Sequence, residues 1–542
     1  MQKTLPVLIG TIFFSWSLIS STFAQQLPNG ISGAFQADAA TYKPDSLIGA
    51  PDVPEKMGLN SYMDLKYVNG NFKAGIRYEV YLNALQGYDP RYKGTGITNR
   101  YASYTYENLE ITAGSFYEQF GSGLIFRTYY DYDLGYDNPM DGINIKYNTH
   151  GLYAKAFVGR QRAFFEYGPG IVRGIDGEVH LAEMFPDLKW GQHNLIIGGS
   201  FVSKYQADND PIYKLPENVG ASAARLNYTN GPLNLFAEYA YKINDPSLVN
   251  GGIYKPGQSL YVSGTYSKKG FGFNAAFKRI DNMNFRSDRN ESVNVLNINF
   301  IPAISKNQTY RLATLYPYAS QVNGEIGAMA EVFYTCKPGS FLGGKYGTGI
   351  NINSSNIHDI KRSYTGDEYG YNSNFFAIGD TVFYQDINVE VTKKINKNLK
   401  VVATYIYQTY NQTVVEGKSK SPLVFADVAV LDFTYKFSST KSLRMELQGL
   451  WTKQDRGDWV FVLAELNVIK NLSVVLYDEY NYGNADEKLQ LHFVNGGLVY
   501  NHNATRVALG YGKQRSGLLC VGGVCRLVPA SNGLTFSIST SF

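Results

Sequence analysis

The chain has 542 residues, 15% of them aromatic, and it contains 44 Tyr and 54 Gly but only 19 Pro. Its formal net charge of +4 is close to neutral for this length and gives no basis for nucleic-acid binding. The mean hydropathy of −0.23 excludes a bundle of membrane-spanning helices, but not a membrane barrel, whose strands turn half of their residues toward a polar lumen. Such a Tyr- and Gly-rich composition, without helical periodicity, favours an all-β fold.

Residues 1–24 resemble a secretory signal peptide. Lys3 supplies the positive charge, a mainly apolar stretch runs from Leu5 to Ile19, and Thr22-Phe23-Ala24 offers a cleavage site before Gln25. The alternative, a transmembrane anchor, is disfavoured because the stretch is shorter than the roughly 20 residues that span a bilayer and lacks a stop-transfer charge cluster. We therefore expect residues 25–542 to form an exported protein.

Strict two-residue alternation is the main structural signal. In the last nine residues, Leu534, Phe536, Ile538 and Phe542 fall on one face, and the residues between them are Thr and Ser. A terminal Phe that closes an amphipathic strand resembles the signal that outer-membrane barrels present to their insertion machinery. Phe542 is therefore the predicted insertion signal, and the barrel assembly machinery is a predicted partner.

The same alternation recurs over segments 72–82, 431–437 and 443–451. Strands of a soluble sandwich alternate too, but they usually span about five or six residues. Several of these segments are long enough for a tilted strand that crosses a bilayer. The pattern places Leu447 against lipid, where Arg should be costly, and Gln448 in the lumen, where Arg should be mild.

Short turns alternate along the chain with longer connections, among them Gln119–Met140, Asn353–Gly379 and Lys513–Pro529. Bacterial barrels place tight turns on the periplasmic side and long loops outside, and Phe542 at the periplasm gives each turn the correct side. The prediction is a single large antiparallel transmembrane β-barrel of about 26 strands, with 22 to 26 acceptable. Strand one should begin near Ile31, so we expect no N-terminal plug domain and no energy-coupled uptake.

The loop Gln119–Met140 is the candidate constriction loop. It combines Gly121, Ser122 and Gly123 with Arg127, several Tyr, and the acids Asp131, Asp133 and Asp137. By analogy with porins, the loop would fold into the lumen and attract cations. An ordinary surface loop is the alternative. A calcium site built from the three acids is weaker, because the segment lacks the Gly and terminal Glu of an EF-hand.

Cys520 and Cys525 enclose Val-Gly-Gly-Val, and an oxidising compartment would let them form a disulfide that stiffens the last loop. Cys336 has no evident partner. The pair offers too few ligands for a metal site, so no metal or other cofactor is predicted.

Several motifs together resemble a family of uncharacterised outer-membrane β-barrel proteins of Bacteroidetes type. They are the segments 517–529, 324–327, 342–348, 123–127 and 135–138, together with the Phe542 end. The resemblance implies a fold and a location in the Gram-negative outer membrane. It implies no activity.

No nucleophile, base and orienting group are linked by any recognisable catalytic signature, so we expect no enzyme. A passive pore for small solutes is the first functional hypothesis, because large barrels usually leave a lumen. The alternative is a non-conducting scaffold or accessory subunit of a larger outer-membrane assembly. The expected partners are therefore outer-membrane lipid and, in the second case, other outer-membrane proteins, with no nucleic acid.

Overall fold

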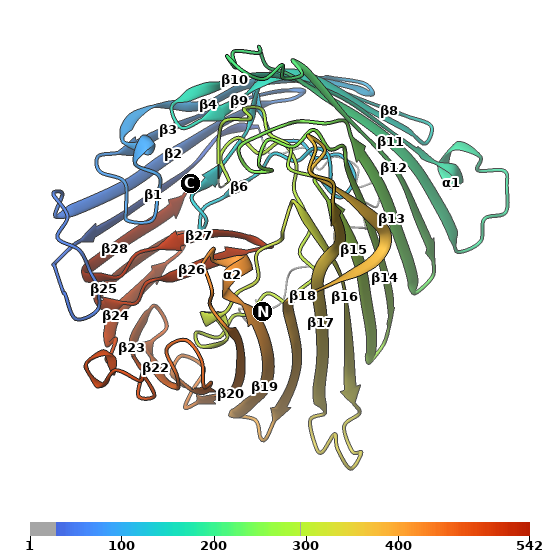
Figure 1. The fold of residues 1–542 in the computed structure, drawn as a ribbon. Helices are drawn as coiled ribbons and strands as arrows, with labels where there is room; N and C mark the ends of the chain where they lie inside the picture. Colours follow the sequence, from blue (N-terminus) through green and yellow to red (C-terminus); the bar gives the residue numbers. More distant parts are fainter. Residues whose placement is uncertain (1–28, 293) are drawn as a thin grey trace.

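The computed structural model describes residues 29–292 and 294–542, so the predicted signal peptide lies outside the described residues. Twenty-four strands form one antiparallel sheet, and each pairs with the next in chain order (Figure 1). The sheet closes into a barrel because β1 pairs with β2 on one side and with β28 on the other. The predicted all-β barrel is confirmed, and 24 strands lie within the predicted range.

The barrel strands of the first half are β1 (Gly30–Thr41), β2 (Met57–Asn69), β3 (Phe72–Tyr81), β4 (Gly94–Tyr106), β5 (Leu109–Phe116), β8 (Met140–Thr149), β9 (Leu152–Ala163), β10 (Glu166–His180), β11 (His193–Tyr205), β12 (Asn218–Asn230), β13 (Leu233–Lys242) and β14 (Gly257–Lys268). Those of the second half are β15 (Phe271–Asp281), β16 (Gly324–Cys336), β17 (Thr348–Tyr364), β18 (Tyr371–Lys394), β19 (Leu399–Asn411), β20 (Leu423–Lys436), β21 (Ser442–Trp451), β22 (Trp459–Ile469), β23 (Leu472–Tyr480), β24 (Asn495–His502), β25 (Thr505–Gln514) and β28 (Ser531–Ser541).

The loops add the short strands β6 (Tyr130–Asp131), β7 (Tyr136–Asp137), β26 (Gly517–Val521) and β27 (Val524–Val528). They also contain the helices α1 (Leu181–Met184) and α2 (Gln412–Val415) and the 3-10 turns Pro90–Tyr92, Ala313–Leu315 and Glu487–Leu489. Within residues 29–292 and 294–542, no helix is long and apolar enough to cross a membrane.

The two ends of the barrel differ in their connections. At one end, here the turn end, most connections are tight, such as 70–71, 107–108 and 150–151. The opposite end, here the loop end, carries long segments, including 117–139 and 282–323.

The predicted long loop at Asn353–Gly379 is wrong. Strands β17 and β18 run through it and continue pairing through three register shifts to Tyr364 and Tyr371, leaving only 365–370 as the connection. Ile360 and Tyr371 pack against Ile326, and this apolar contact stabilises a hairpin whose polar composition had suggested a loop.

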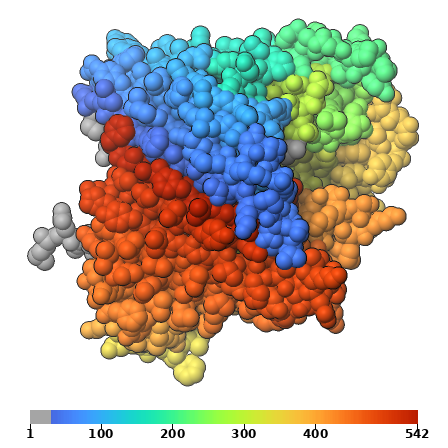
Figure 2. All heavy atoms as spheres, turned by 90° about the vertical axis from the view of Figure 1, so that its left-hand side faces the viewer, coloured from blue at the N-terminus to red at the C-terminus, as the bar shows by residue number. Residues whose placement is uncertain are grey.

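The alternation separates an apolar outer face from a polar inner face. Leu447 and Phe536 are 39% and 40% exposed on the outer face, whereas Gln448 is 2% exposed inside. At the seam between β1 and β28, Phe542 lies on the outer face of Gly33, and a Cβ at position 33 would stand 2.4 Å from the Phe542 ring. The N-terminal and C-terminal strands meet on the face that Figure 2 shows. The hydrophobic core lies inside the barrel, between the wall and loops that fold inward.

Candidate functional site: loops folded into the lumen

The lumen contains three inward-folded segments, which we call the first inner loop (117–139), the second inner loop (282–323, described except for residue 293) and the terminal hairpin (β26 and β27). In Figure 1 their chain is drawn inside the ring of barrel strands, where β6, β26 and β27 are labelled. Together they form what is here called the plug. The plug is made of segments that connect barrel strands, not of a domain before the barrel. The prediction that no N-terminal plug domain is present therefore did not anticipate a filled lumen.

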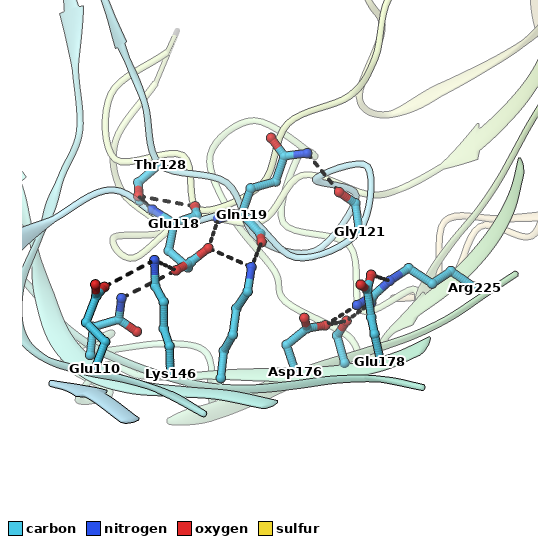
Figure 3. Close-up of polar contacts among 12 residues, drawn as sticks. Glu110, Glu118, Gln119, Gly121, Thr128, Lys146, Asp176, Glu178 and Arg225 are labelled. Atoms are coloured by element: carbon cyan, nitrogen blue, oxygen red, sulfur yellow. Dashed lines mark hydrogen bonds and ion pairs between the residues drawn. The ribbon is translucent and has the colours of Figure 1, made fainter. Parts of the chain in front are cut away.

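The first inner loop is tied to the wall by charged contacts at its start (Figure 3). The Glu118 carboxylate lies 2.9 Å from both Lys146 Nζ and Lys155 Nζ, which project from β8 and β9. Burial alone would raise the pKa of Glu118, but the two ammonium groups outweigh it and lower the pKa to about 2. The loop therefore begins on a carboxylate that stays ionised at neutral pH.

A close backbone approach follows three residues later. The Ser122 N–H donates to Glu238 Oε2 on β13 at 2.7 Å. Gly121 makes this possible, because its φ is +51° and a Cβ there would lie 2.4 Å from Glu238 Oε1. Phe120, Leu124 and Phe126 then turn their fully buried side chains into the core.

The structure places the four predicted constriction residues in different surroundings. Arg127 lies over the rings of Tyr129 and Phe300, 4.6 and 4.1 Å from their centroids, and burial lowers its pKa. Asp131 accepts a hydrogen bond from the Leu134 N–H at 3.0 Å. Burial raises the pKa of Asp131, because the half-buried carboxylate is partly desolvated.

The other two acids contrast sharply. Asp137 is buried against Arg162 and against Arg77, whose Nη1 lies 3.2 Å away, so its charge is compensated by the wall. Asp133 is exposed. In the part of the chain that the structure describes, no three His, Cys, Asp or Glu side chains are grouped as a metal site.

The second inner loop crosses the lumen from wall to wall. On β9, Gln161 Nε2 donates to the Asn297 carbonyl at 2.5 Å, and the Ser287 hydroxyl donates to Gln161 Oε1 at 2.7 Å. On β21, Gln448 Oε1 accepts from the Leu312 N–H at 2.8 Å. Since β21 is the twelfth strand after β9 in a ring of 24, the two anchors stand on opposite walls.

Further anchors lie between these two points. Gln308 donates to Asn388 on β18 at 2.6 Å, and Arg311 Nε lies 2.7 Å from Glu479 Oε2 on β23. Glu479 also forms an ion pair with Arg515 at 2.5 Å. One wholly buried carboxylate therefore contacts both the second inner loop and Arg515, which lies just before the terminal hairpin.

The plug segments also hold one another. The Arg127 N–H donates to the Ile298 carbonyl at 2.8 Å, and the Phe300 N–H donates to the Gly123 carbonyl at 2.9 Å. The Ser320 N–H reaches the carbonyl of Gly523 in the terminal hairpin at 2.9 Å. Ile298, Ile304 and Leu312 are wholly buried in the shared core, so the plug is a folded unit.

Sequence reasoning missed the second inner loop. Alternation at 295–300 is indistinguishable from that of a wall strand, and only Pro302 and Pro317 signal that no barrel strand continues there. Gln448 also differs from the lumen-facing residue that was expected to tolerate substitution by Arg. Because it accepts a plug N–H while 2% exposed, Arg at this site would disrupt an anchor, which corrects the expected mild effect.

The terminal hairpin contains the predicted disulfide between Cys520 and Cys525, with the Cα atoms 4.1 Å apart. Cys336 is a free, buried cysteine, as expected from its lack of a partner.

Beneath the first inner loop, the turn end of the lumen holds a cavity of about 620 Å³ that is lined by both charged and aromatic side chains. Its charged lining comes from Asp64, Lys66, Lys73, Arg77, Glu110 and Lys146. The lumen thus combines a mixed-charge vestibule at the turn end with a packed plug toward the loop end.

Solved structures with a similar fold are outer-membrane barrels. The P pilus usher (PapC) translocation pore aligns over 94% of this chain and 99% of its own, with 12% identity and a TM-score of 0.45. The siderophore receptor PirA from Pseudomonas aeruginosa aligns over 95% and 80%, with 10% identity and a TM-score of 0.40. The FrpB iron transporter from Neisseria meningitidis aligns over 95% and 83%, with 9% identity and a TM-score of 0.38. At these values the similarity concerns barrel architecture alone.

No curated protein sequence is significantly similar to this chain. A sequence-family model does match it over residues 1–542, and its description is "family of unknown function (DUF6029)". The protein therefore belongs to this family of unknown function.

Proposed function

We propose that this protein is an outer-membrane transporter for small solutes, closed at rest by its own plug and conducting only when the plug moves. The outer face supports the membrane location, because apolar side chains such as Leu447 and Phe536 remain exposed on long barrel strands. The contrast between the turn end and the loop end matches bacterial barrels with short periplasmic turns.

The wall-to-wall path of the second inner loop carries the proposal. A segment anchored on β9 and on β21 cannot leave the axis of the lumen without breaking hydrogen bonds on one wall. Burial of a large apolar side chain is worth about 1.5–3 kcal/mol, so buried residues such as Ile298 and Leu312 resist displacement. This favours a gated conduit over the permanently open passive pore.

Removal of the second inner loop tests whether it closes the lumen. Asp281 and Gly324 are already paired neighbours, so a short Gly-containing turn can replace 282–323 without altering β15 or β16. In planar bilayers we expect wild type to be almost silent and the shortened protein to conduct steadily. A matched control replaces the exposed stretch 209–214 in the loop between β11 and β12 and should remain silent. A silent plug-deleted barrel would contradict the proposal.

Solute uptake tests whether the closed barrel opens. In a Cys336→Ser background, a short bis-maleimide can reach the buried thiols introduced by Ser287→Cys and Gln161→Cys when the plug is displaced, and it then joins them, because the two replaced side chains touch at 2.7 Å in the closed barrel. Cross-linking should abolish uptake of small sugars into proteoliposomes, while either single cysteine with the same reagent should not. If wild-type proteoliposomes took up no more solute than protein-free liposomes, the proposed transport function would be wrong.

A non-conducting accessory subunit is the second candidate, and one observation favours it. At the turn end, the connection 337–347 presents Phe341 at 99% and Leu342 at 58% exposure. An exposed apolar tip of this kind suits contact with another protein. Complete absence of uptake would move this candidate ahead of transport.

A further inference from the structure

Three arginines lie on the outer face within five consecutive strands: Arg100 on β4, Arg160 on β9 and Arg173 on β10. Arg173 stands between Ile171 and Ile175, which are 39% and 60% exposed, and alternation turns all three outward. Arg160 follows the outward Val158 by two residues, and Arg100 pairs with the outward Ile76. These guanidinium groups therefore project away from the lumen.

Most of this positive charge is not neutralised. Arg100 Nη2 lies 3.6 Å from Asp141 Oδ2, and Asp141 pairs directly with Arg160 across β8 and β9. Among the described residues, Asp141 is the one carboxylate within salt-bridge distance of any of the three arginines. Their side chains also donate hydrogen bonds to neutral groups: the Tyr167 hydroxyl, the Gly168 carbonyl and the Asn218 side-chain amide. Three arginines and one aspartate leave a net charge of +2.

An apolar groove adjoins the arginines. It has a volume of about 300 Å³ and is lined by Ile143, Ile145, Ala156, Val158, Ile175 and Phe201. Arg173 and Ser203 also line it, and Ser203 stands two residues from the loop end of β11. The register pairs Arg173 with Val158, so Arg160 is its diagonal neighbour at the same rim. The groove is therefore apolar along its length and cationic at its loop-end rim.

A guanidinium on a lipid-facing surface is unfavourable unless it reaches the headgroup layer or meets an anion. Arginine binds phosphate through two parallel, charge-assisted hydrogen bonds. The occupant that satisfies both parts of this surface is amphiphilic, with an anionic head for the rim and a hydrocarbon chain for the groove.

We propose that β8–β11 form a binding site for a phosphorylated lipid of the leaflet at the loop end. Its phosphate groups contact Arg160 and Arg173, and one acyl chain occupies the groove. The site rests on the proposed outer-membrane location, but not on the plug or on solute transport.

Native mass spectrometry of the full protein in detergent tests the site, with diphosphorylated lipid A and its dephosphorylated form as probes. We expect wild type to retain one phosphorylated lipid with at least about tenfold preference, the scale of one to two charge-assisted hydrogen bonds. Arg160→Gln with Arg173→Gln should remove this preference. Lys436→Gln with Lys441→Gln makes the same change in net charge at exposed positions near the turn end and should not.

A second variant tests the groove separately. Ala156→Trp fills it while keeping both arginines, and should weaken retention of both lipids. Equal retention by wild type and the double arginine variant would overturn the proposal. Displacement of the lipid by millimolar inorganic phosphate would also overturn it, because it would indicate a site for free anions. If the protein instead failed to insert into bilayers at all, the proposed location would be wrong, which a loss of lipid preference alone does not imply.

Discussion

Glu479→Gln should release the plug without altering the wall. Glu479 is wholly buried and contacts Arg311 of the second inner loop at 2.7 Å and Arg515, which precedes the terminal hairpin, at 2.5 Å. The amide keeps one acceptor oxygen but no charge, so two guanidinium groups lose their counterion.

The magnitude follows from the exposure of the two arginines. Removing one partner of a buried ion pair costs about 3–5 kcal/mol. The Arg311 side chain is 29% exposed, so water compensates for part of its loss, whereas that of Arg515 is 9% exposed. We therefore expect the plug to lose about 2–3 kcal/mol relative to its displaced state. At about 1.4 kcal/mol per tenfold change, the displaced population rises roughly 30- to 150-fold.

The rate of thiol labelling measures this population. Leu312 is wholly buried, so in a Cys336→Ser background a cysteine introduced by Leu312→Cys reacts with maleimide only when the second inner loop leaves its site. Glu479→Gln in this background should accelerate labelling by the same factor.

Asp176→Asn is the matched control. Asp176 is also buried, and the side chains that it contacts, Arg225 and Ser200, belong to the wall. The control should leave the labelling rate of the introduced cysteine nearly unchanged. If both substitutions accelerated labelling equally, or if neither accelerated it, the assigned role of Glu479 would be refuted.

Four further outcomes are expected. Leu447→Arg should cost about 2–4 kcal/mol near the bilayer midplane, measured by urea unfolding from vesicles, and a cost no larger than that of Lys441→Arg would contradict the outer-face assignment. Without reductant, the intact protein should be two hydrogen atoms lighter than its reduced form because of the Cys520–Cys525 disulfide, and Cys336 should be alkylated only after unfolding; alkylation of all three in the native protein would exclude this. Glu118 has a pKa of about 2 in the folded protein, below its value of about 4.5 in the unfolded chain. Its ion pairs therefore stabilise the folded loop fully above about pH 4.5, and this stabilisation is lost as the pH falls toward 2. Pepsin should therefore cut the first inner loop increasingly over this window, and Glu118→Gln should flatten that dependence; an unchanged profile would assign the transition to other groups. In the barrel lacking 282–323, Asp133→Asn should reduce the cation preference read from reversal potentials more than Asp137→Asn does, because Arg77 and Arg162 already compensate Asp137, and the reverse order would refute this assignment.

The wall of the barrel was largely predictable from the sequence. Alternation at 443–451 depends only on which side of a strand faces an apolar environment. Leu447 and Gln448 could therefore be assigned to opposite faces without knowing which strands pair with this one. Tight turns such as 107–108 fixed the two ends by parity.

The plug was only partly predictable, because it depends on contacts between distant segments. An inward fold of the first inner loop was expected by analogy, but its anchors were not. Glu118 is held by Lys155, 37 positions along the chain, and Gln161 bonds to Asn297, 136 positions away. No local pattern specifies such pairs. The residues at 295–300 show the limit clearly, because wall strands and plug segments both bury one apolar face.

The span of the second inner loop from β9 to β21 has a mechanical consequence. A wide, empty cylinder flattens easily under lateral pressure, but a cross-strut joining opposite walls resists that distortion. If the strut detaches from either wall, the barrel softens in the same event that clears its axis. If the protein transports solutes as proposed, the same few hydrogen bonds would control both its permeability and its stiffness, and tension in the surrounding bilayer would act directly on the plug.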